Sequence, residues 1–135
     1  MSPATGSRGS RDIRVLVVDD HEAVREGLAS VLEKASGVEL VGEAENGRIG
    51  IEMAMALVPD VILMDINMPD TDGIEATRII CAASPRIKII GFSLDGGSPA
   101  VTAMLEAGAS AHISKDSSMK EVLTAIRKHD GKRPE

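Results

Sequence analysis

The sequence predicts an α/β fold built on a doubly wound parallel sheet, with helices on both faces of five strands. Short β-branched apolar runs, typical of strands buried on both faces, alternate five times with segments in which apolar residues recur at helical spacing. Helix-capping residues, Gly and Pro separate these segments. With 135 residues the chain has the length of one domain and can bury a core without disulfides.

Three strands and two helices are expected in the first half of the chain. The strands are predicted at residues 13–18, 38–44 and 61–64. A helix begins at residue 21, where the apolar period changes, and Gly37 suits the position just after its end. Asn46 is a suitable N-cap for the second helix, which ends before Pro59 because the residue preceding a proline disfavours helical geometry.

The second half of the chain is expected to add three helices and two strands. They are predicted as a helix at about 73–83, a strand at 87–92, a helix from 99 that stops at 108, a strand at 111–114 and a last helix from 118. Asp72 with Glu75 and Ser118 with Glu121 have the spacing of a capping box, and Pro99 suits the first position of a helix.

Composition and charge exclude several classes of function. The formal charge is −6, and the chain has one Phe and no Trp or Tyr, which disfavours direct binding to nucleic acid. One Cys excludes an internal disulfide framework and a Cys-rich zinc site. No apolar run is long enough to span a membrane, and a signal peptide is not recognisable, so a cytoplasmic protein is expected. Residues 1–11 are expected to form a disordered tail and residues 130–135 a loose C-terminal end.

Polar residues follow four of the predicted strands. Asp19 and Asp20 come after the first strand, Asp65 after the third, Ser93 after the fourth and Lys115 after the fifth. Taken singly, each has an ordinary explanation as a helix cap, a turn residue or a solvated surface charge. Because ligands of doubly wound sheets bind beyond the carboxyl ends of the strands, their common position at one edge favours a functional site.

The charges of these residues indicate the chemistry of that site. Three clustered carboxylates without a His or Cys ligand suit a hard divalent ion, Mg²⁺ or Mn²⁺. A carboxylate can also act as a nucleophile and form an aspartyl phosphate. Lys115 and Ser93 are suited to neutralise and hydrogen-bond the oxygens of a phosphoryl group.

The segments that carry these residues resemble the receiver domain of two-component response regulators. The resemblance covers about residues 12–129 and rests on VLVVDDHEAVREGL (15–28), VILMDINMPDTDGIEATR (61–78), the Ser after the fourth strand and GASAHISKD (108–116). VDDH-x-x-VR-x-GL and the Lys-Asp pair most resemble the NarL/FixJ-like subfamily with a LuxR-type helix-turn-helix output domain. The resemblance implies a flavodoxin-like (βα)5 sandwich with strand order 2-1-3-4-5.

The resemblance also implies a role for each position. Asp65 would accept the phosphoryl group. Mg²⁺ would be held by Asp20 directly, by Asp19 mainly through water, by Asp65 and by the backbone carbonyl of Asn67. The phosphoryl group and the switch would involve Ser93, Leu94, His112 and Lys115. Donors would be the phosphohistidine of a histidine kinase or a small acyl phosphate, and the chain would be no enzyme beyond self-catalysed phosphoryl acceptance and autodephosphorylation.

A signalling face is implied at the fourth helix, the fifth strand and the last helix, and a homodimer through this face is a further expectation. The face is expected to carry Ala100, Met104, Ala107, Met119 and Leu123 or their neighbours. A helix-turn-helix output domain is not expected within these 135 residues.

The sequence departs from the family's pattern at two places. His112 stands where the family usually has Tyr or Phe, and the stretch 95–98, Asp-Gly-Gly-Ser, is looser than usual. An imidazole that turns toward Ser93 would sit near the phosphoryl group, so phosphorylation is expected to raise the pKa of His112. The alternative is an exposed His112 that couples to nothing.

Two other functions are left open by the residues. A phosphatase with an aspartyl-phosphate intermediate would need a general acid two residues after Asp65, where the chain has Asn67. A degenerate receiver would act only as a protein-interaction module. The acidic loop after the first strand and the lack of aromatic residues disfavour a flavin carrier, and the missing G-x-G-x-x-G motif disfavours dinucleotide binding.

Overall fold

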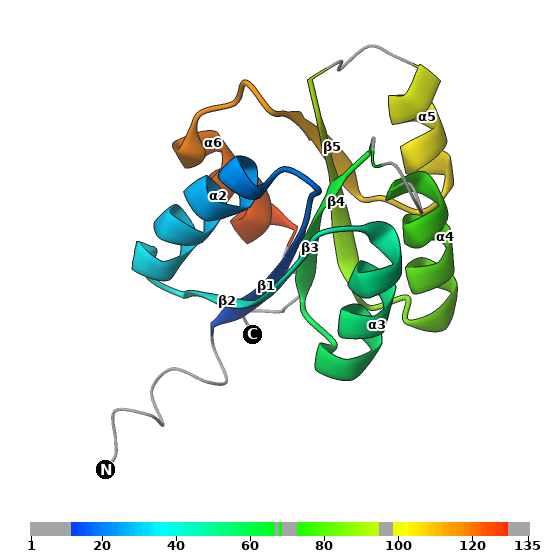
Figure 1. Ribbon diagram of the computed structural model, residues 1–135, viewed down its shortest axis with the longest axis horizontal. Coiled ribbons are helices and arrows are strands. Elements are labelled where there is room, and N and C mark those ends of the chain that lie inside the picture. The colour runs from blue at the N-terminus through cyan, green and yellow to red at the C-terminus, as the bar shows by residue number, and fades with distance from the viewer. Residues whose placement is uncertain (1–11, 67, 69–72, 95–98, 130–135) are drawn as a thin grey trace.

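The predicted sheet is present with the implied strand order. The computed structural model describes residues 12–66, 68, 73–94 and 99–129. Within them, five parallel strands lie in the order β2-β1-β3-β4-β5 (Figure 1). The elements follow one another as β1 (Ile13–Val18), α2 (Glu22–Lys34), β2 (Val38–Ala44), α3 (Gly47–Leu57), β3 (Val61–Asp65), α4 (Gly73–Ala83), β4 (Lys88–Ser93), α5 (Pro99–Glu106), β5 (Ala111–Ser114) and α6 (Met119–Lys128).

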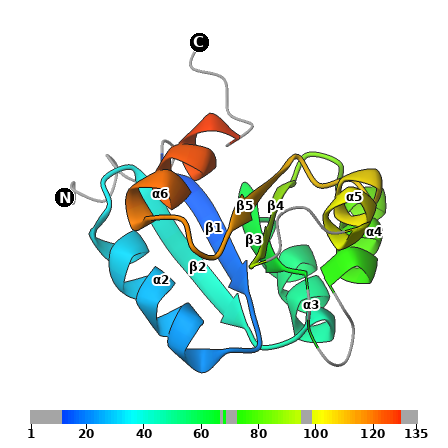
Figure 2. The same cartoon turned by 90° about the horizontal axis from the view of Figure 1, so that it is seen from above.

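Helices cover the sheet on both sides. The sheet lies between α2 and α6 on one face and α3, α4 and α5 on the other (Figures 1 and 2). The chain runs from β1 outward to β2, and then returns through α3 to β3 on the other side of β1. This reversal places the topological switch point between β1 and β3, where doubly wound sheets bind their ligands. None of the described helices is long and apolar enough to cross a membrane.

Side chains that alternate along the strands build one core on each face. Leu16, Val18, Ile62 and Met64 pack with α3, α4 and α5, whereas the intervening residues of β1 and β3 pack with α2 and α6. All five residues of β3 are buried, as expected for the middle strand of a covered parallel sheet. The third and central strand therefore carries Asp65 into the interior at its last position.

Two predicted helix caps are confirmed. Asn46 Oδ1 accepts a hydrogen bond of 2.9 Å from the backbone N–H of Ile49. Ser118 and Glu121 form the complete capping box, with Ser118 Oγ accepting from Glu121 N at 3.1 Å and Glu121 Oε1 accepting from Ser118 N at 2.8 Å. The strands β3 and β4 each run one residue further than expected, to Asp65 and Ser93. The expected cap at Asp72, the stretch 95–98 and both chain ends lie outside the described residues.

The end of α3 has an unusual backbone conformation. Val58 adopts φ 47° and ψ 65°, in the left-handed region, while its N–H donates to Ala54 O at 2.9 Å. Arg14 Nη1 donates to the carbonyls of Leu57 and Val58, at 2.7 and 2.8 Å, and so satisfies the helix end. A β-branched residue is poorly suited to this region, in which glycine is the usual choice.

We expect Val58→Gly to stabilise the protein. Left-handed geometry destabilises a residue with a Cβ by about 1–2 kcal/mol, and glycine removes this strain. The greater conformational entropy of glycine in the unfolded chain offsets about 0.5–1 kcal/mol of the stabilisation. The side chain is 53% exposed, so its removal loses little packing. Urea denaturation followed by circular dichroism should show a gain of about 0.5–1 kcal/mol. Val58→Ala, which keeps the Cβ, is the control and should gain less; a Val58→Gly protein less stable than the parent would contradict the argument.

Candidate functional site

The carboxyl edge of the sheet gathers the polar residues expected there. Asp19 follows β1, Asp65 ends β3, Ser93 ends β4 and Lys115 follows β5. Backbone hydrogen bonds continue the strand pairing into this edge, with Asp19 N donating to Ala44 O at 3.0 Å and Lys115 N to Ser93 O at 2.9 Å. The side chains are therefore held by the rigid end of the sheet.

Lys115 joins the two most deeply buried carboxylates. Its Nζ lies 3.0 Å from Asp19 Oδ2 and 3.3 Å from Asp65 Oδ1, and the side-chain exposures are 12%, 1% and 2% for Lys115, Asp19 and Asp65. The ammonium passes over the ring of Phe92, 5.8 Å from its centroid, on the way. A positive charge from the edge strand β5 thus reaches carboxylates on β1 and β3.

The remaining negative charge fits a divalent cation. The three carboxylates of Asp19, Asp20 and Asp65 exceed the charge of Lys115 by two. Apart from ion pairs with Lys115 and His21, the buried Asp19 Oδ2 and Asp20 Oδ1 accept no hydrogen bond from the described part of the chain. Hard oxygen ligands of this kind suit Mg²⁺ or Mn²⁺. Asn67, whose carbonyl was the fourth expected metal ligand, lies outside the described residues.

His112 and Ser93 contact each other beside this edge. Ser93 Oγ and His112 Nε2 are 3.0 Å apart, and the half-buried imidazole faces the side of the sheet on which α5 lies. Burial lowers the pKa of His112 from its ordinary value of 6.5. Gly91 is the partner of His112 in the strand pairing, and a Cβ there would lie 3.0 Å from Met104 Cγ and 3.6 Å from His112 Cδ2, so the missing side chain leaves room chiefly for Met104. Leu94, expected to belong to the switch, is mostly exposed.

His21 also belongs to the acidic cluster, although the sequence indicated a site with oxygen ligands alone. Its Nδ1 lies 3.0 Å from Asp19 Oδ1 and 3.2 Å from Asp20 Oδ1. The backbone N–H of His21 donates to Asp19 Oδ1 at 2.8 Å. His21 has no His or Cys at the spacing of a metal site, so such spacing does not identify it. Its position directly after the pair Asp19 and Asp20 is the feature of the sequence that could have placed it in the cluster.

Two further residues support the site without having been predicted. Arg25 Nη1 donates to the carbonyl of Asp19 at 2.7 Å, and its Nε lies 3.6 Å from Glu43 Oε1 on β2. Gly73, the first residue of α4, packs so tightly that a Cβ there would lie 2.1 Å from the carbonyl oxygen of Asp65. Its sequence signal is its place directly after Asp72 in the motif segment 61–78.

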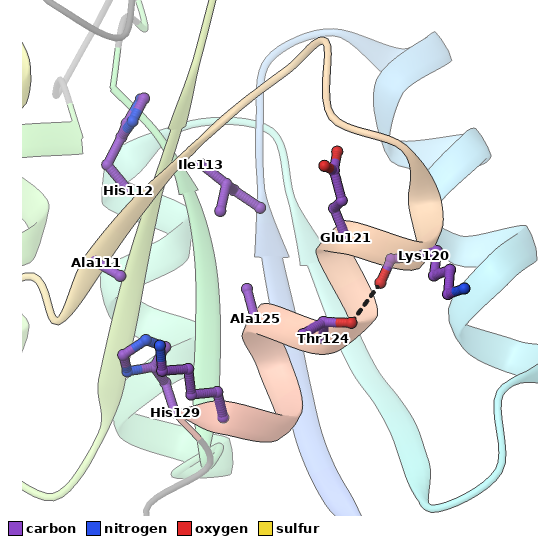
Figure 3. A pocket seen from close by; sticks show the side chains of 9 residues that line it. Ala111, His112, Ile113, Lys120, Glu121, Thr124, Ala125 and His129 are labelled. Carbon is purple, nitrogen blue, oxygen red and sulfur yellow. Dashed lines mark hydrogen bonds between the residues drawn. The ribbon is translucent and has the colours of Figure 1, made fainter.

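The expected signalling face corresponds to α5, β5 and α6, and one of the residues expected on it is not at the surface. Met104 is fully buried and accepts a 3.4 Å hydrogen bond from Thr77 Oγ1, so its prediction as a surface residue was wrong. Ala100, Ala107, Met119 and Leu123 are half-buried. A cavity of about 430 Å³ lies between β5 and α6 on this face, and Figure 3 shows Ile113 and His112 on opposite sides of the strand.

Known proteins are similar to this chain in sequence and in fold. The sequence model of the response regulator receiver domain matches residues 15–127. The response regulator GacA of Pseudomonas viridiflava is 41% identical over 115 residues, and the transcriptional regulatory protein LiaR of Bacillus subtilis is 45% identical over 117 residues. Each alignment covers 85% of this chain and 54% of the relative, so the chain spans about half the length of the curated relatives it matches.

Solved structures of response regulators are also similar to this chain in fold. The receiver domain of the response regulator NarL from Mycobacterium tuberculosis has a TM-score of 0.85 at 31% identity, covering 91% of this chain and 99% of that one. A LuxR-family two-component response regulator from Aurantimonas sp. SI85-9A1 has a TM-score of 0.81 at 34% identity, covering 87% and 84%. These similarities agree with the resemblance seen in the sequence motifs.

We expect Arg25 to tune metal affinity through the backbone of Asp19. Arg25→Ala should weaken Mg²⁺ binding by about tenfold, as loss of a residue behind a metal ligand commonly does. The Mg²⁺ affinity of Arg25→Lys should lie between those of the parent and Arg25→Ala, because lysine keeps the charge but its single nitrogen cannot contact both Asp19 O and Glu43 Oε1. Isothermal titration calorimetry measures the affinities, with circular dichroism to verify folding. Arg48→Ala, which breaks the exposed pair with Glu52, is the matched control; Mg²⁺ affinity unaltered in Arg25→Ala would refute this role.

Proposed function

This chain belongs to the response regulator receiver domain family of two-component systems, and we propose that Asp65 is its phosphoacceptor in a Mg²⁺-dependent reaction. The observation that carries the proposal is the place of Asp65 at the end of the buried central strand, 3.3 Å from Lys115 and in one cluster with Asp19 and Asp20. The donors would be the phosphohistidine of a histidine kinase or a small acyl phosphate.

In the proposed reaction an oxygen of Asp65 attacks the phosphorus atom. The new O–P bond forms as the P–N bond of the phosphohistidine breaks, and the bonding electron pair leaves with the donor imidazole. Lys115 Nζ and Ser93 Oγ would bind equatorial phosphoryl oxygens. Mg²⁺, or Mn²⁺, held by Asp19, Asp20, Asp65 and the carbonyl of Asn67, would neutralise charge on those oxygens.

The other parts of the proposal follow from the same reaction. The receiver would comprise residues 12–129 and act in the cytoplasm. It would be no enzyme beyond its own phosphorylation and autodephosphorylation, and would make no direct contact with nucleic acid or membrane. Its output would be a change at the face of α5, β5 and α6, which a homodimer would use. The presence of an intact set of Asp19, Asp20, Asp65, Ser93 and Lys115 favours an active over a degenerate receiver.

Phosphorylation by acetyl phosphate tests the assignment of Asp65. With Mg²⁺, intact-protein mass spectrometry should show one added phosphoryl group, and Asp65→Asn should abolish it because the amide is not a nucleophile. Asp116→Asn is the matched control, since Asp116 is an exposed carboxylate next to Lys115, and it should be labelled like the parent. Full labelling of the Asp65→Asn protein would exclude Asp65 as the acceptor.

Phosphorylation is also expected to raise the pKa of His112. Burial holds that pKa below 6.5 in the unmodified protein, and a phosphoryl group bound by Ser93 would favour the charged imidazolium 3.0 Å from the Ser93 hydroxyl. By linkage, lower pH would then favour the phosphorylated form. NMR titration of the imidazole, with and without beryllofluoride as a phosphoryl mimic, measures the change. Superimposable titration curves for His112 would rule the coupling out.

A further inference from the structure

We propose that an apolar cavity beside Lys115 binds the acyl chain of a small acyl phosphate, so that this receiver prefers donors with a chain longer than acetyl. The inference rests on the proposed function and names the donor that the same site accepts best. The cavity has a volume of about 240 Å³ and lies between α2, the end of β4 and the start of α6. Apart from Lys115, its lining residues are Ala23, Val24, Gly27, Leu28, Phe92 and Met119.

The cavity lies on the face of the sheet toward which Asp65 points. Side chains alternate along a strand, so Asp65 shares the face of Leu63, which packs with α2 and α6. Phe92, which lines the cavity, is the partner of Asp65 in the pairing of β3 with β4. Neighbouring strands lie only about 4.8 Å apart. The acceptor carboxylate of the proposed function and a residue that lines the cavity are therefore neighbours on one face.

Lys115 connects the cavity to the acceptor. It lines the cavity, and its Nζ lies 3.3 Å from Asp65 Oδ1 and 5.8 Å from the centroid of the Phe92 ring. A ligand that fits both parts needs an anionic end for the ammonium group and an apolar end for the cavity. An acyl phosphate with a chain of several carbons has both ends, whereas acetyl phosphate has only a methyl group to bury.

The size and the small residues of the cavity suit such a chain. A water molecule takes about 30 Å³ of liquid volume, and a methylene group is of similar size, so the cavity has room for several carbons. Ala23 and Gly27 lie one turn apart on α2 and keep that side of the cavity open. A Cβ on Gly27 would have no neighbour within 4 Å outside the backbone of its own helix.

The proposed step is a displacement at phosphorus. An oxygen of Asp65 forms the new O–P bond while the bond between phosphorus and the acyl oxygen breaks, and the bonding electron pair leaves with the carboxylate product. A chain held in the cavity stabilises the bound donor and the transition state alike, which raises the second-order rate constant. Each methylene removed from water contributes about a fourfold increase, so butyryl phosphate should react about tenfold faster than acetyl phosphate.

The rates of phosphorylation by these two donors test the inference. Intact-protein mass spectrometry with Mg²⁺ gives both second-order rate constants, and their ratio is taken within each protein so that general effects on the site cancel. We expect a butyryl-to-acetyl ratio of about ten in the parent, because butyrate and acetate are leaving groups of almost equal basicity. Gly27→Leu and Ala23→Leu each fill the cavity and should lower the ratio to about one.

Ser30→Leu is the matched control. It adds the same side chain to an exposed position of α2 that does not line the cavity, so its ratio should equal that of the parent. Circular dichroism verifies that each variant is folded.

The alternative outcomes are distinct. Equal rate constants for the two donors in the parent would overturn the inference, while labelling of Asp65 by acetyl phosphate would leave the proposed function standing. The cavity would then be left to a side chain of a protein donor. A ratio that stays at the parent's value in both cavity-filling variants, or that falls equally in Ser30→Leu, would also overturn it, because the preference would arise outside the cavity. If neither donor labels the parent, the proposed function fails together with the inference.

Discussion

The ion pairs of Lys115 with Asp19 and Asp65 hold the candidate site together. Carboxylates that are 1% and 2% exposed are costly to bury unless a positive charge compensates them. Only the strand order makes the compensation available, because β5 must lie beyond β4 for a lysine after it to reach across Phe92 to β3 and β1. One ammonium against three carboxylates leaves the site attractive to a divalent cation, so the same arrangement that permits folding also creates the candidate metal site.

Backbone contacts hold the carboxylates in place around that charge. Arg25 ties the turn after β1 to β2 through Asp19 O and Glu43, and the β1–β2 pairing continues to Asp19 N. On the other side, Gly73 N donates to Ile66 O at 3.1 Å and brings the start of α4 against Asp65. Asp19 and Asp65 are thus held by groups that take no part in the chemistry, which is how rigid sites are usually supported.

The sequence predicts most of this arrangement because its strongest signals are local. Asn46 and Ser118 are caps that act within three residues, and the residues after each strand share an edge whenever the strands are parallel. Met104 was misplaced because α5 is short and apolar on several sides, so the pattern does not fix which side faces the core. The positions of His21 Nδ1 and the Arg25 guanidinium depend on a turn and on side-chain reach, which residue spacing does not encode.

Because Gly73 packs against the backbone of Asp65, the site tolerates substitution of its carboxylates better than substitution of Gly73. Exchanging a clustered carboxylate for its amide removes repulsion and keeps the shape, so chemistry can be lost while the fold persists. At Gly73 the smallest addition, a single methyl group, would come 2.1 Å from a carbonyl oxygen and must displace either α4 or the end of β3. A side chain at Gly73 would therefore disturb the backbone that holds the site, whereas an amide in place of a carboxylate changes the chemistry and leaves the shape.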